Sequence, residues 1–246
     1  MKRIKNIKGL VAASVCASAL FLLAGCTKQL TQTPQSTASN TAIFSSAQGL
    51  QLYSNSFYDS LPSAATIVRG DDQYGNADYG ARNSDPLYLQ GATFNSQQTG
   101  SGDWRWSTLR NINYFIANAS IPNAGVADAV RQNYLGLARF FRAYFYYGMV
   151  TKFGNVPWIG KPLGTGDSAL YSAQTDRTIV IDSVIADLDY AAQHITLTTD
   201  ATSSQITKWV AYGLKSRVCL FEGTFRKYQT QYNLGGLFPI CFCKDI

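Results

Sequence analysis

The chain has 246 residues, of which 46% are hydrophobic, 13% aromatic and 15% charged. This composition supports a globular protein with a sizeable core, in one large or two small domains, and excludes a largely disordered chain. The 21 basic and 15 acidic residues give a net charge of +6, but residues 1–25 hold four of the basic and none of the acidic ones. The remaining 17 basic and 15 acidic residues leave only +2, so the sequence predicts no nucleic-acid partner.

Residues 1–25 have the pattern of a bacterial lipoprotein signal peptide. Four basic residues precede an uncharged apolar stretch from Leu10 to Ala24, which is the length of a signal-peptide core and short for a membrane span. The sequence Leu-Ala-Gly-Cys then resembles a lipobox, in which Cys26 receives the lipid. An ordinary secretory signal with a chance cysteine and a membrane-spanning anchor are the alternatives. Residues 26–45 are polar, rich in Thr, Ser and Gln, and predict a flexible tether.

Helical periodicity dominates the rest of the chain, and no sustained alternation of apolar and polar residues indicates a strand. The spacing of apolar residues predicts helices at about 46–60, 103–120, 126–152, 178–195 and 207–228. Asp103 is the expected N-cap of the second helix. The sequence therefore predicts an all-α fold of antiparallel helix pairs stacked side by side, joined by long irregular loops at 62–103 and 158–176.

The helix at 126–152 contains an aromatic run, with six aromatic residues among the eight from Phe140 to Tyr147. Most of these rings fall on two adjoining stripes that cover about half of the helix circumference, a pattern that predicts packing against at least two neighbours. Arg139, Arg142 and Tyr146 are expected on the opposite side. The two arginines either form a docking face or bridge neighbouring helices, and we favour the bridging interpretation.

Catalytic and metal-binding patterns are weak. His194 is the single histidine and is expected to cap a helix end or lie at the surface, so no catalytic residue and no cofactor are predicted. Cys219 lies in an apolar helical pattern and is expected to be a small buried residue. Cys241 and Cys243 lack the further ligands of a structural zinc site, so no metal site or disulfide framework is predicted.

Four stretches of the chain resemble the N-terminal half of SusD/RagB-type outer-membrane lipoproteins. They are Cys26 with its tether and the following helix, Trp106–Asn118, Ala138–Ile159, and the pair Asp182–Ile195 and Ile206–Tyr228. The resemblance implies a tetratricopeptide-like helical domain at 46–228, a glycan ligand, and a TonB-dependent, SusC-like transporter as partner. It also implies a lipid-anchored, surface-exposed location at the outer membrane, although the tether lacks the acidic residues that many members carry. Members are about twice as long, and residues 229–246 look atypical, as in a truncated chain.

The candidate ligand site lies in the long loop before the second helix. Carbohydrate sites combine aromatic faces with polar side chains that hydrogen-bond hydroxyls, and this loop is dense in both. The candidate glycan-binding residues are Asp71, Asp72, Tyr74, Tyr79, Arg82, Asn83 and Trp104. Trp106, in contrast, lies on the apolar stripe of the helix and is expected in the core. Alternatively, the polar residues cap turns, or the loop binds calcium, although the EF-hand spacing is missing.

The leading hypothesis is a lipid-anchored glycan-binding protein that captures oligosaccharides for an outer-membrane transporter. The alternative is a helical protein-interaction scaffold at the outer membrane without a sugar site of its own. An enzyme is not predicted, because the sequence has none of the motifs that place a nucleophile, a metal or a phosphate.

Overall fold

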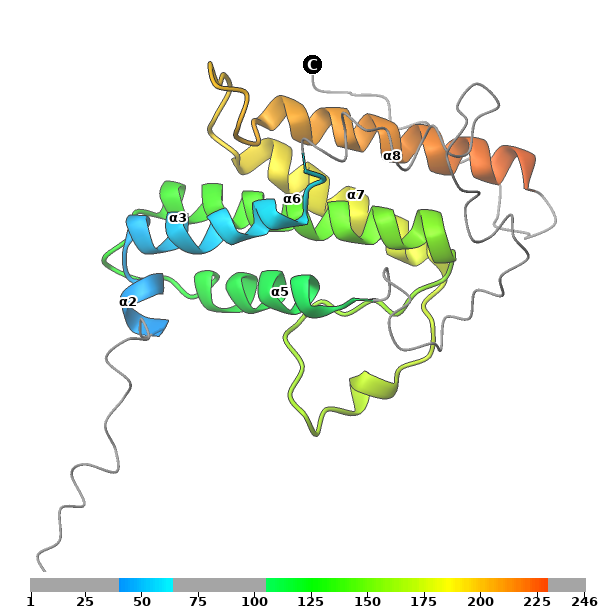
Figure 1. Cartoon of the computed structure of the whole chain (residues 1–246), viewed down its shortest axis with the longest axis horizontal. Coiled ribbons are helices and arrows are strands. Elements are labelled where there is room, and N and C mark those ends of the chain that lie inside the picture. Colours follow the sequence, from blue (N-terminus) through cyan, green and yellow to red (C-terminus); the bar gives the residue numbers. More distant parts are fainter. Residues whose placement is uncertain (1–39, 64–104, 230–246) are drawn as a thin grey trace, which may run out of the picture. The chain divides into compact units, whose positions relative to one another are not determined.

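The computed structural model describes residues 40–63 and 105–229, and these form a helical protein (Figure 1). Within these two ranges there is no β-strand, and a lone antiparallel bridge joins Val156 to Thr175. The all-α prediction is confirmed. The helical elements, with η marking 3₁₀ helices, are α2 (Asn40–Phe44), α3 (Ala47–Asn55), η2 (Ser56–Ser60), α5 (Ser107–Ala119), α6 (Asp128–Phe153), η4 (Ser168–Tyr171), α7 (Arg177–His194) and α8 (Lys208–Tyr228).

Helix α6 is the central element. It packs against α3, α5 and α7, and α7 in turn packs against α8 (Figure 1). Helices α6 and α7 run antiparallel: moving forward along α6 from Gln132 to Arg142, the hydrogen-bonded partners move backward along α7 from Tyr190 to Asp187. Stacked antiparallel pairs of this kind are the predicted architecture.

The aromatic run of α6 is core, as its spacing predicts. Phe140, Phe141 and Tyr146 are buried, and Phe141 packs against Phe57 and Tyr58 of η2. Tyr146 and Arg142, which the spacing places on the opposite side of the helix, are buried as well: Tyr146 fully and Arg142 nearly so. Periodicity identifies the most apolar face of a helix, but α6 is enclosed on several sides, so its less apolar face is buried as well.

Arg142 bridges α6 and α7, which confirms the bridging interpretation. Its Nε and Nη2 atoms donate to the two carboxylate oxygens of Asp187 at 2.6 and 2.7 Å. The side chain of Arg139 lies 3.7 Å from the same carboxylate and stacks over the ring of Tyr190. Because both members of the Arg142–Asp187 pair are buried, each depends on the other for its hydrogen bonds and counter-charge.

Polar side chains cap the N-termini of α3, η4, α7 and α8. Ser46 accepts a hydrogen bond from the backbone N–H of Gly49, and Thr207 caps α8 in the same way through Val210. Gly154 is the C-cap residue of α6 and has a φ of 72°, a backbone conformation that favours glycine. The predicted cap at Asp103 was wrong, because α5 begins only at Ser107.

Two short helices lie in segments for which no helix was expected. Helix α2 occupies residues within the range assigned to the tether, and η4 lies in the loop between α6 and α7. Both are too short to give a clear periodic signal, which explains why the pattern missed them. No helix in the described ranges is both long enough and apolar enough to cross a membrane.

Helix α8 packs through a different face than its apolar spacing suggests. Val218 is buried as expected, and Cys219 is a buried free cysteine, but Val210 is 41% exposed. Glu222 is fully buried instead, where it pairs with Arg177 of α7 at 2.6 Å. The burial of a charged residue such as Glu222 can be predicted only when its partner of opposite charge on another helix is known.

Candidate functional site

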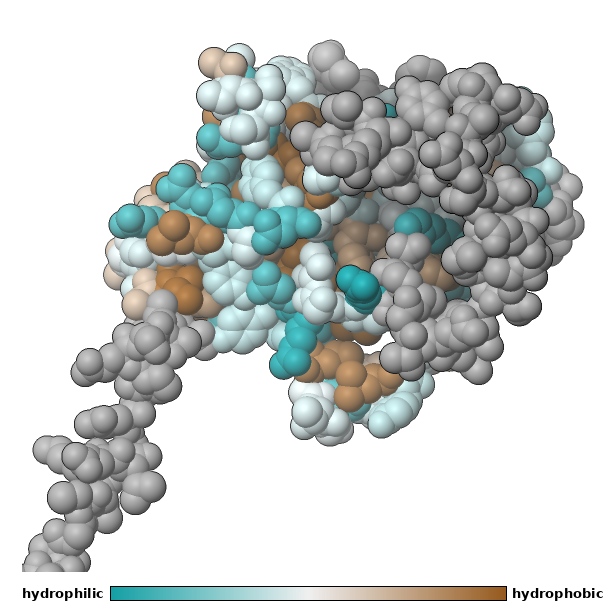
Figure 2. Space-filling model, in the orientation of Figure 1, coloured by the Kyte–Doolittle hydropathy of each residue, from teal (hydrophilic) through white to brown (hydrophobic). Residues whose placement is uncertain are grey.

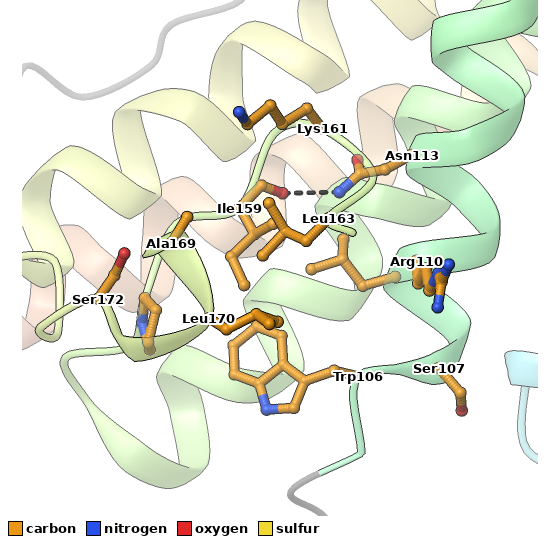
Figure 3. A pocket seen from close by; sticks show the side chains of 12 residues that line it. Trp106, Ser107, Arg110, Asn113, Ile159, Lys161, Leu163, Ala169, Leu170 and Ser172 are labelled. Carbon is orange, nitrogen blue, oxygen red and sulfur yellow. Dashed lines mark hydrogen bonds between the residues drawn. The ribbon is translucent and has the colours of Figure 1, made fainter. Parts of the chain in front are cut away.

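A cavity of about 560 Å³ opens between the start of α5 and the segment that connects α6 to α7 (Figure 3). Its mostly apolar wall includes a tryptophan and several aliphatic side chains, and its polar groups are hydroxyl, amide and cationic. The residues that line it are Trp106, Ser107, Leu109, Arg110, Asn113, Pro157, Ile159, Lys161, Leu163, Ala169, Leu170 and Ser172.

Trp106 immediately precedes the first residue of α5. Its ring packs against Phe145 and Tyr146 of α6, with ring centroids 5.6 and 6.4 Å apart, as expected for a residue of the apolar stripe. The side chain is only partly buried, however, and it also lines the cavity, where Leu170 lies beside it (Figure 3). A partly exposed indole anchored by other rings is a rigid apolar surface for a ligand.

The segment from Pro157 to Gly160 forms one wall and is held by buried polar groups of α5 and α6. The Asn113 amide donates to the carbonyl of Ile159 at 2.7 Å (Figure 3), and the Tyr146 hydroxyl accepts the N–H of Ile159 at 2.6 Å. Arg142 donates to the carbonyl of Gly160 at 3.3 Å. A loop that would otherwise leave backbone groups unpaired is thereby fixed in one conformation.

Tyr146 is a neutral phenol in this setting. Burial raises the pKa of its hydroxyl well above the ordinary value, and the hydrogen bond from Ile159 and the charge of Arg142 only partly oppose that effect. The ring also lies against Trp158, with centroids 4.2 Å apart. Tyr146 therefore supports the wall through its hydroxyl and through its ring.

The rim of the cavity carries two cations. Arg110 is exposed and forms no ion pair in the described part of the chain, whereas Lys161 lies 3.4 Å from the carboxylate of Asp167. The backbone N–H of Ala169 and, to a smaller extent, Lys161 lower the pKa of Asp167, so that carboxylate is ionised at neutral pH. Among the described lining residues there is no carboxylate and no histidine.

Apolar side chains also reach the surface beside the cavity. In Figure 2 a hydrophobic patch lies at the bottom of the view, on the segment that carries η4, and Leu170 of that segment is 49% exposed. An apolar lining with a few convergent polar groups is the usual composition of a small-molecule site. This arrangement can hold a sugar ring on its apolar face while hydroxyls reach the polar rim.

All of the sequence-predicted binding residues, and the lipidation site Cys26, lie outside the described residues. The same is true of the loop for which calcium binding was the alternative. The structure therefore does not place Asp71, Asp72, Tyr74, Tyr79, Arg82, Asn83 or Trp104. Within the described ranges, no cluster of three or more His, Cys, Asp or Glu side chains gathers to hold a metal ion. His194 stacks on Tyr190 at the end of α7, and its Nδ1 lies 2.9 Å from the Tyr190 carbonyl, which confirms a helix-end position.

Sequence reasoning missed the cavity itself, because its second wall comes from a loop about fifty residues further along the chain. One signal was present. Asn113 is a polar residue in the otherwise apolar stripe of α5, and such a residue must find a buried partner. That partner is the carbonyl of Ile159, at the edge of the cavity.

Comparison with known proteins gives consistent results. The family described as "Starch-binding associating with outer membrane", the SusD-like family, matches residues 44–216. SusD-like protein P2 of Formosa agariphila is 30% identical over 114 residues, which cover 45% of this chain and 22% of that protein. SusD-like protein P25 of the same organism is 22% identical over 125 residues, which cover 50% of this chain and 23% of that protein. The chain thus spans less than a quarter of the length of these relatives.

Solved structures show the same fold. A SusD-like protein of Bacteroides fragilis superposes with a TM-score of 0.62 at 20% identity, over 82% of this chain and 40% of that one. A laminarin-binding SusD-like protein gives a TM-score of 0.55 at 19% identity, over 73% and 41% of the two chains. At such identities the likeness shows the fold alone, and it supports the tetratricopeptide-like arrangement of helices.

Proposed function

The chain belongs to the SusD-like family, and from this premise we propose that it is a carbohydrate-binding protein whose ligand lies against Trp106. The observation that carries the proposal is the cavity beside that residue. Its volume suits one or two sugar rings, its floor is apolar, and its rim offers the hydroxyl and cationic donors of Ser107, Arg110 and Lys161. The laminarin-binding neighbour supports a glycan as the ligand class.

We further propose that the loop before α5 completes the site. Trp104 is two residues before Trp106 in the sequence, and Asp71, Asp72, Tyr74, Tyr79, Arg82 and Asn83 come from the same loop. Planar carboxylate, amide and guanidinium groups bind vicinal hydroxyls in pairs of hydrogen bonds, and a second tryptophan adds another stacking surface.

The proposed setting is the bacterial outer membrane. A lipid on Cys26 would anchor the chain, and a TonB-dependent, SusC-like transporter would receive the captured oligosaccharide. The support is the lipobox pattern and the family description, which refers to association with the outer membrane. Replacement of Cys26 by serine should move the chain from the membrane fraction to the soluble fraction of cells, and an unchanged distribution would refute the lipid anchor.

Affinity electrophoresis tests the ligand site. The full chain should be retarded in native gels that contain laminarin or amylopectin, and Trp106→Ala or Trp104→Ala should lose most of that retardation. Trp209→Ala is a matched control, because Trp209 is a half-exposed tryptophan on α8 that does not line the cavity. Equal retardation of Trp106→Ala and the native chain would contradict the assignment of the ligand to this cavity.

A second candidate function is a protein-interaction scaffold for the transporter, which the outer surface of α8 favours. Leu220 is 70% exposed there, and Trp209 and Tyr228 are also exposed. In this case the transporter should co-purify with the chain, the complex should survive Trp106→Ala, and Leu220→Glu should disrupt it. A complex unaffected by Leu220→Glu would remove the observation that favours this alternative.

A further inference from the structure

A second concave site lies towards the other end of α6 and is built entirely from described residues. It is a groove of about 550 Å³, and α3, η2, the first half of α6 and the segment after α7 surround it. Its lining residues are Gln51, Ser54, Asn55, Tyr58, Asn133, Tyr134, Leu137, Ile195, Thr196, Leu197, Ser204, Gln205 and Ile206.

The lining of this groove is polar but carries no charged side chain. It combines side-chain amides and hydroxyls with two tyrosines and several aliphatic residues. An anion that entered it would lose hydration without finding a counter-charge, and the carboxylate of Asp200, whose charge acts on Tyr58, would repel it. A neutral ligand with many hydroxyl groups meets no such penalty.

Several polar groups of the groove have no hydrogen-bond partner among the residues that the structure describes. In the described ranges, the side-chain amides of Gln51, Asn55 and Gln205 and the half-buried hydroxyl of Tyr134 form no hydrogen bond. Asn133 uses only its oxygen, which accepts from the backbone N–H and the hydroxyl of Thr196 at 2.8 and 3.1 Å, so its amide protons are available. The groove thus presents donors and acceptors that are free to bind a ligand.

The walls of the groove are held in place by other residues. The hydroxyl of Tyr58 accepts the backbone N–H of Ile206 at 3.0 Å, which ties η2 to the segment after α7. The carboxylate of Asp200 accepts the backbone N–H groups of Thr202, Ser204 and Gln205, and so closes the turn that precedes Ile206. A polar site on fixed walls loses little conformational entropy when a ligand binds.

We propose that this groove is a second carbohydrate-binding site, which takes a neutral saccharide unit. An amide side chain offers one donor and one acceptor in a plane and so matches a pair of sugar hydroxyls, while the tyrosine rings offer apolar surface to the ring face. The choice of a saccharide over other neutral polar ligands rests on the proposed function, but the groove does not depend on the Trp106 cavity. The two are about 18 Å apart along α6, measured from Tyr134 to Tyr146 at 1.5 Å per residue.

The test is calorimetric titration of the full chain with laminarihexaose and, separately, with maltoheptaose. The groove variants are Gln51→Ala combined with Asn55→Ala, and Tyr134→Phe, none of which removes a hydrogen bond within the described protein. Gln48→Ala is the matched control, since Gln48 is an exposed glutamine of the same helix that does not line the groove. Each variant is compared in the native background and in the Trp106→Ala background, with thermal unfolding to verify the fold.

We expect Trp106→Ala to weaken binding without abolishing it, and the binding that remains to fall at least tenfold when either groove variant is added, with no change for Gln48→Ala. If Trp106→Ala abolishes binding and the groove variants do nothing in the native background, the groove proposal is overturned while the cavity proposal stands. If only the groove variants weaken binding, the groove stands and the cavity assignment fails. Absence of binding by the native chain to both sugars overturns the two together, and groove-dependent binding of trigalacturonate overturns the restriction to neutral ligands.

Discussion

The Trp106 cavity and the neutral groove are built on the same helix but differ in how their polar groups are used. At the cavity, buried polar groups of α5 and α6 bind backbone atoms of the wall and are fully occupied by that task. At the groove, amides and a hydroxyl line the surface without partners in residues 40–63 and 105–229. A polar residue of a helix can therefore either hold a loop in place or remain available to bind a ligand. Which of the two roles it has depends on its burial and on whether it has a hydrogen-bond partner in the protein.

The largest effect should come from the ion pair beneath the cavity wall. Asp187→Ala leaves the buried guanidinium of Arg142 without a counter-charge, and we expect the free energy of unfolding to fall by about 3–5 kcal/mol. Urea denaturation measures the change. Asp189→Ala is the control on the same helix, since its pair with Lys215 is more exposed and should matter by about 1 kcal/mol or less. A loss for Asp187→Ala as small as that of the control would show that the pair does not hold the wall.

The two tyrosines provide the sharpest contrast between the regions. Tyr146→Phe leaves the N–H of Ile159 without its acceptor at the cavity wall, so we expect a loss of about 1–3 kcal/mol in unfolding free energy. Tyr134→Phe removes a hydroxyl that has no partner in the described chain and should leave stability within about 0.5 kcal/mol. Thermal unfolding of the two variants side by side measures both, and equal losses would remove the distinction between fixed and free polar groups.

Low pH should destabilise the turn beside the groove, because it protonates the carboxylate of Asp200. The hydroxyl of Thr202 and the backbone N–H of Gln205 lower the pKa of this carboxyl from 3.8 to about 2. A pKa that is lower in the folded state gives stability that is present above pH 3.8 and is lost as the pH falls through about 2. Unfolding measured from pH 5 to 2 should therefore show a decline that Asp200→Asn reduces, and an identical decline in the variant would contradict the role of this carboxylate.

The smallest effect is expected at the rim of the cavity. Lys161→Ala removes an exposed ion pair, and such pairs contribute little, so the free energy of unfolding should hardly change. The pKa of Asp167 should rise only part of the way to its ordinary value, because the backbone N–H of Ala169 is the larger cause of the shift. Carbon-detected titration of the carboxyl measures this, and a full return to the ordinary pKa would assign the shift to Lys161 instead.

The outcomes for particular residues show which features of the fold could be predicted from the sequence. The spacing of Leu109, Ile112 and Ile116 predicted the buried face of α5, and all three are buried. The same method did not predict the burial of Tyr146, because a period of 3.6 ranks the faces of one helix and carries no information about how many neighbours enclose it. The spacing also could not predict that Trp106 and Leu170 line the same cavity, since residues about sixty positions apart come into proximity only when the loop folds back.

The predicted ligand residues illustrate a different limit. Asp71 to Asn83 were selected because polar and aromatic side chains crowd a segment without periodicity, and they lie outside the described residues, so the selection stays a prediction. The groove residues Gln51, Asn55 and Asn133 were missed because each is an ordinary surface amide within its own helix. Only the approach of α3, α6 and the segment after α7 brings them together.

The sequence by itself determined the helices, the family and the packing role of the aromatic run in α6, because periodicity, caps and short motifs are local properties of the chain. The tertiary structure alone decided that Arg142 would be buried against Asp187, that Tyr146 would hold a loop, and that the amides of three segments would share one groove. The physical reason is that burial and hydrogen bonding depend on which distant groups come within about 3 Å of each other. That proximity is determined by the packing of the helices, and the spacing of residues within any one helix does not predict it.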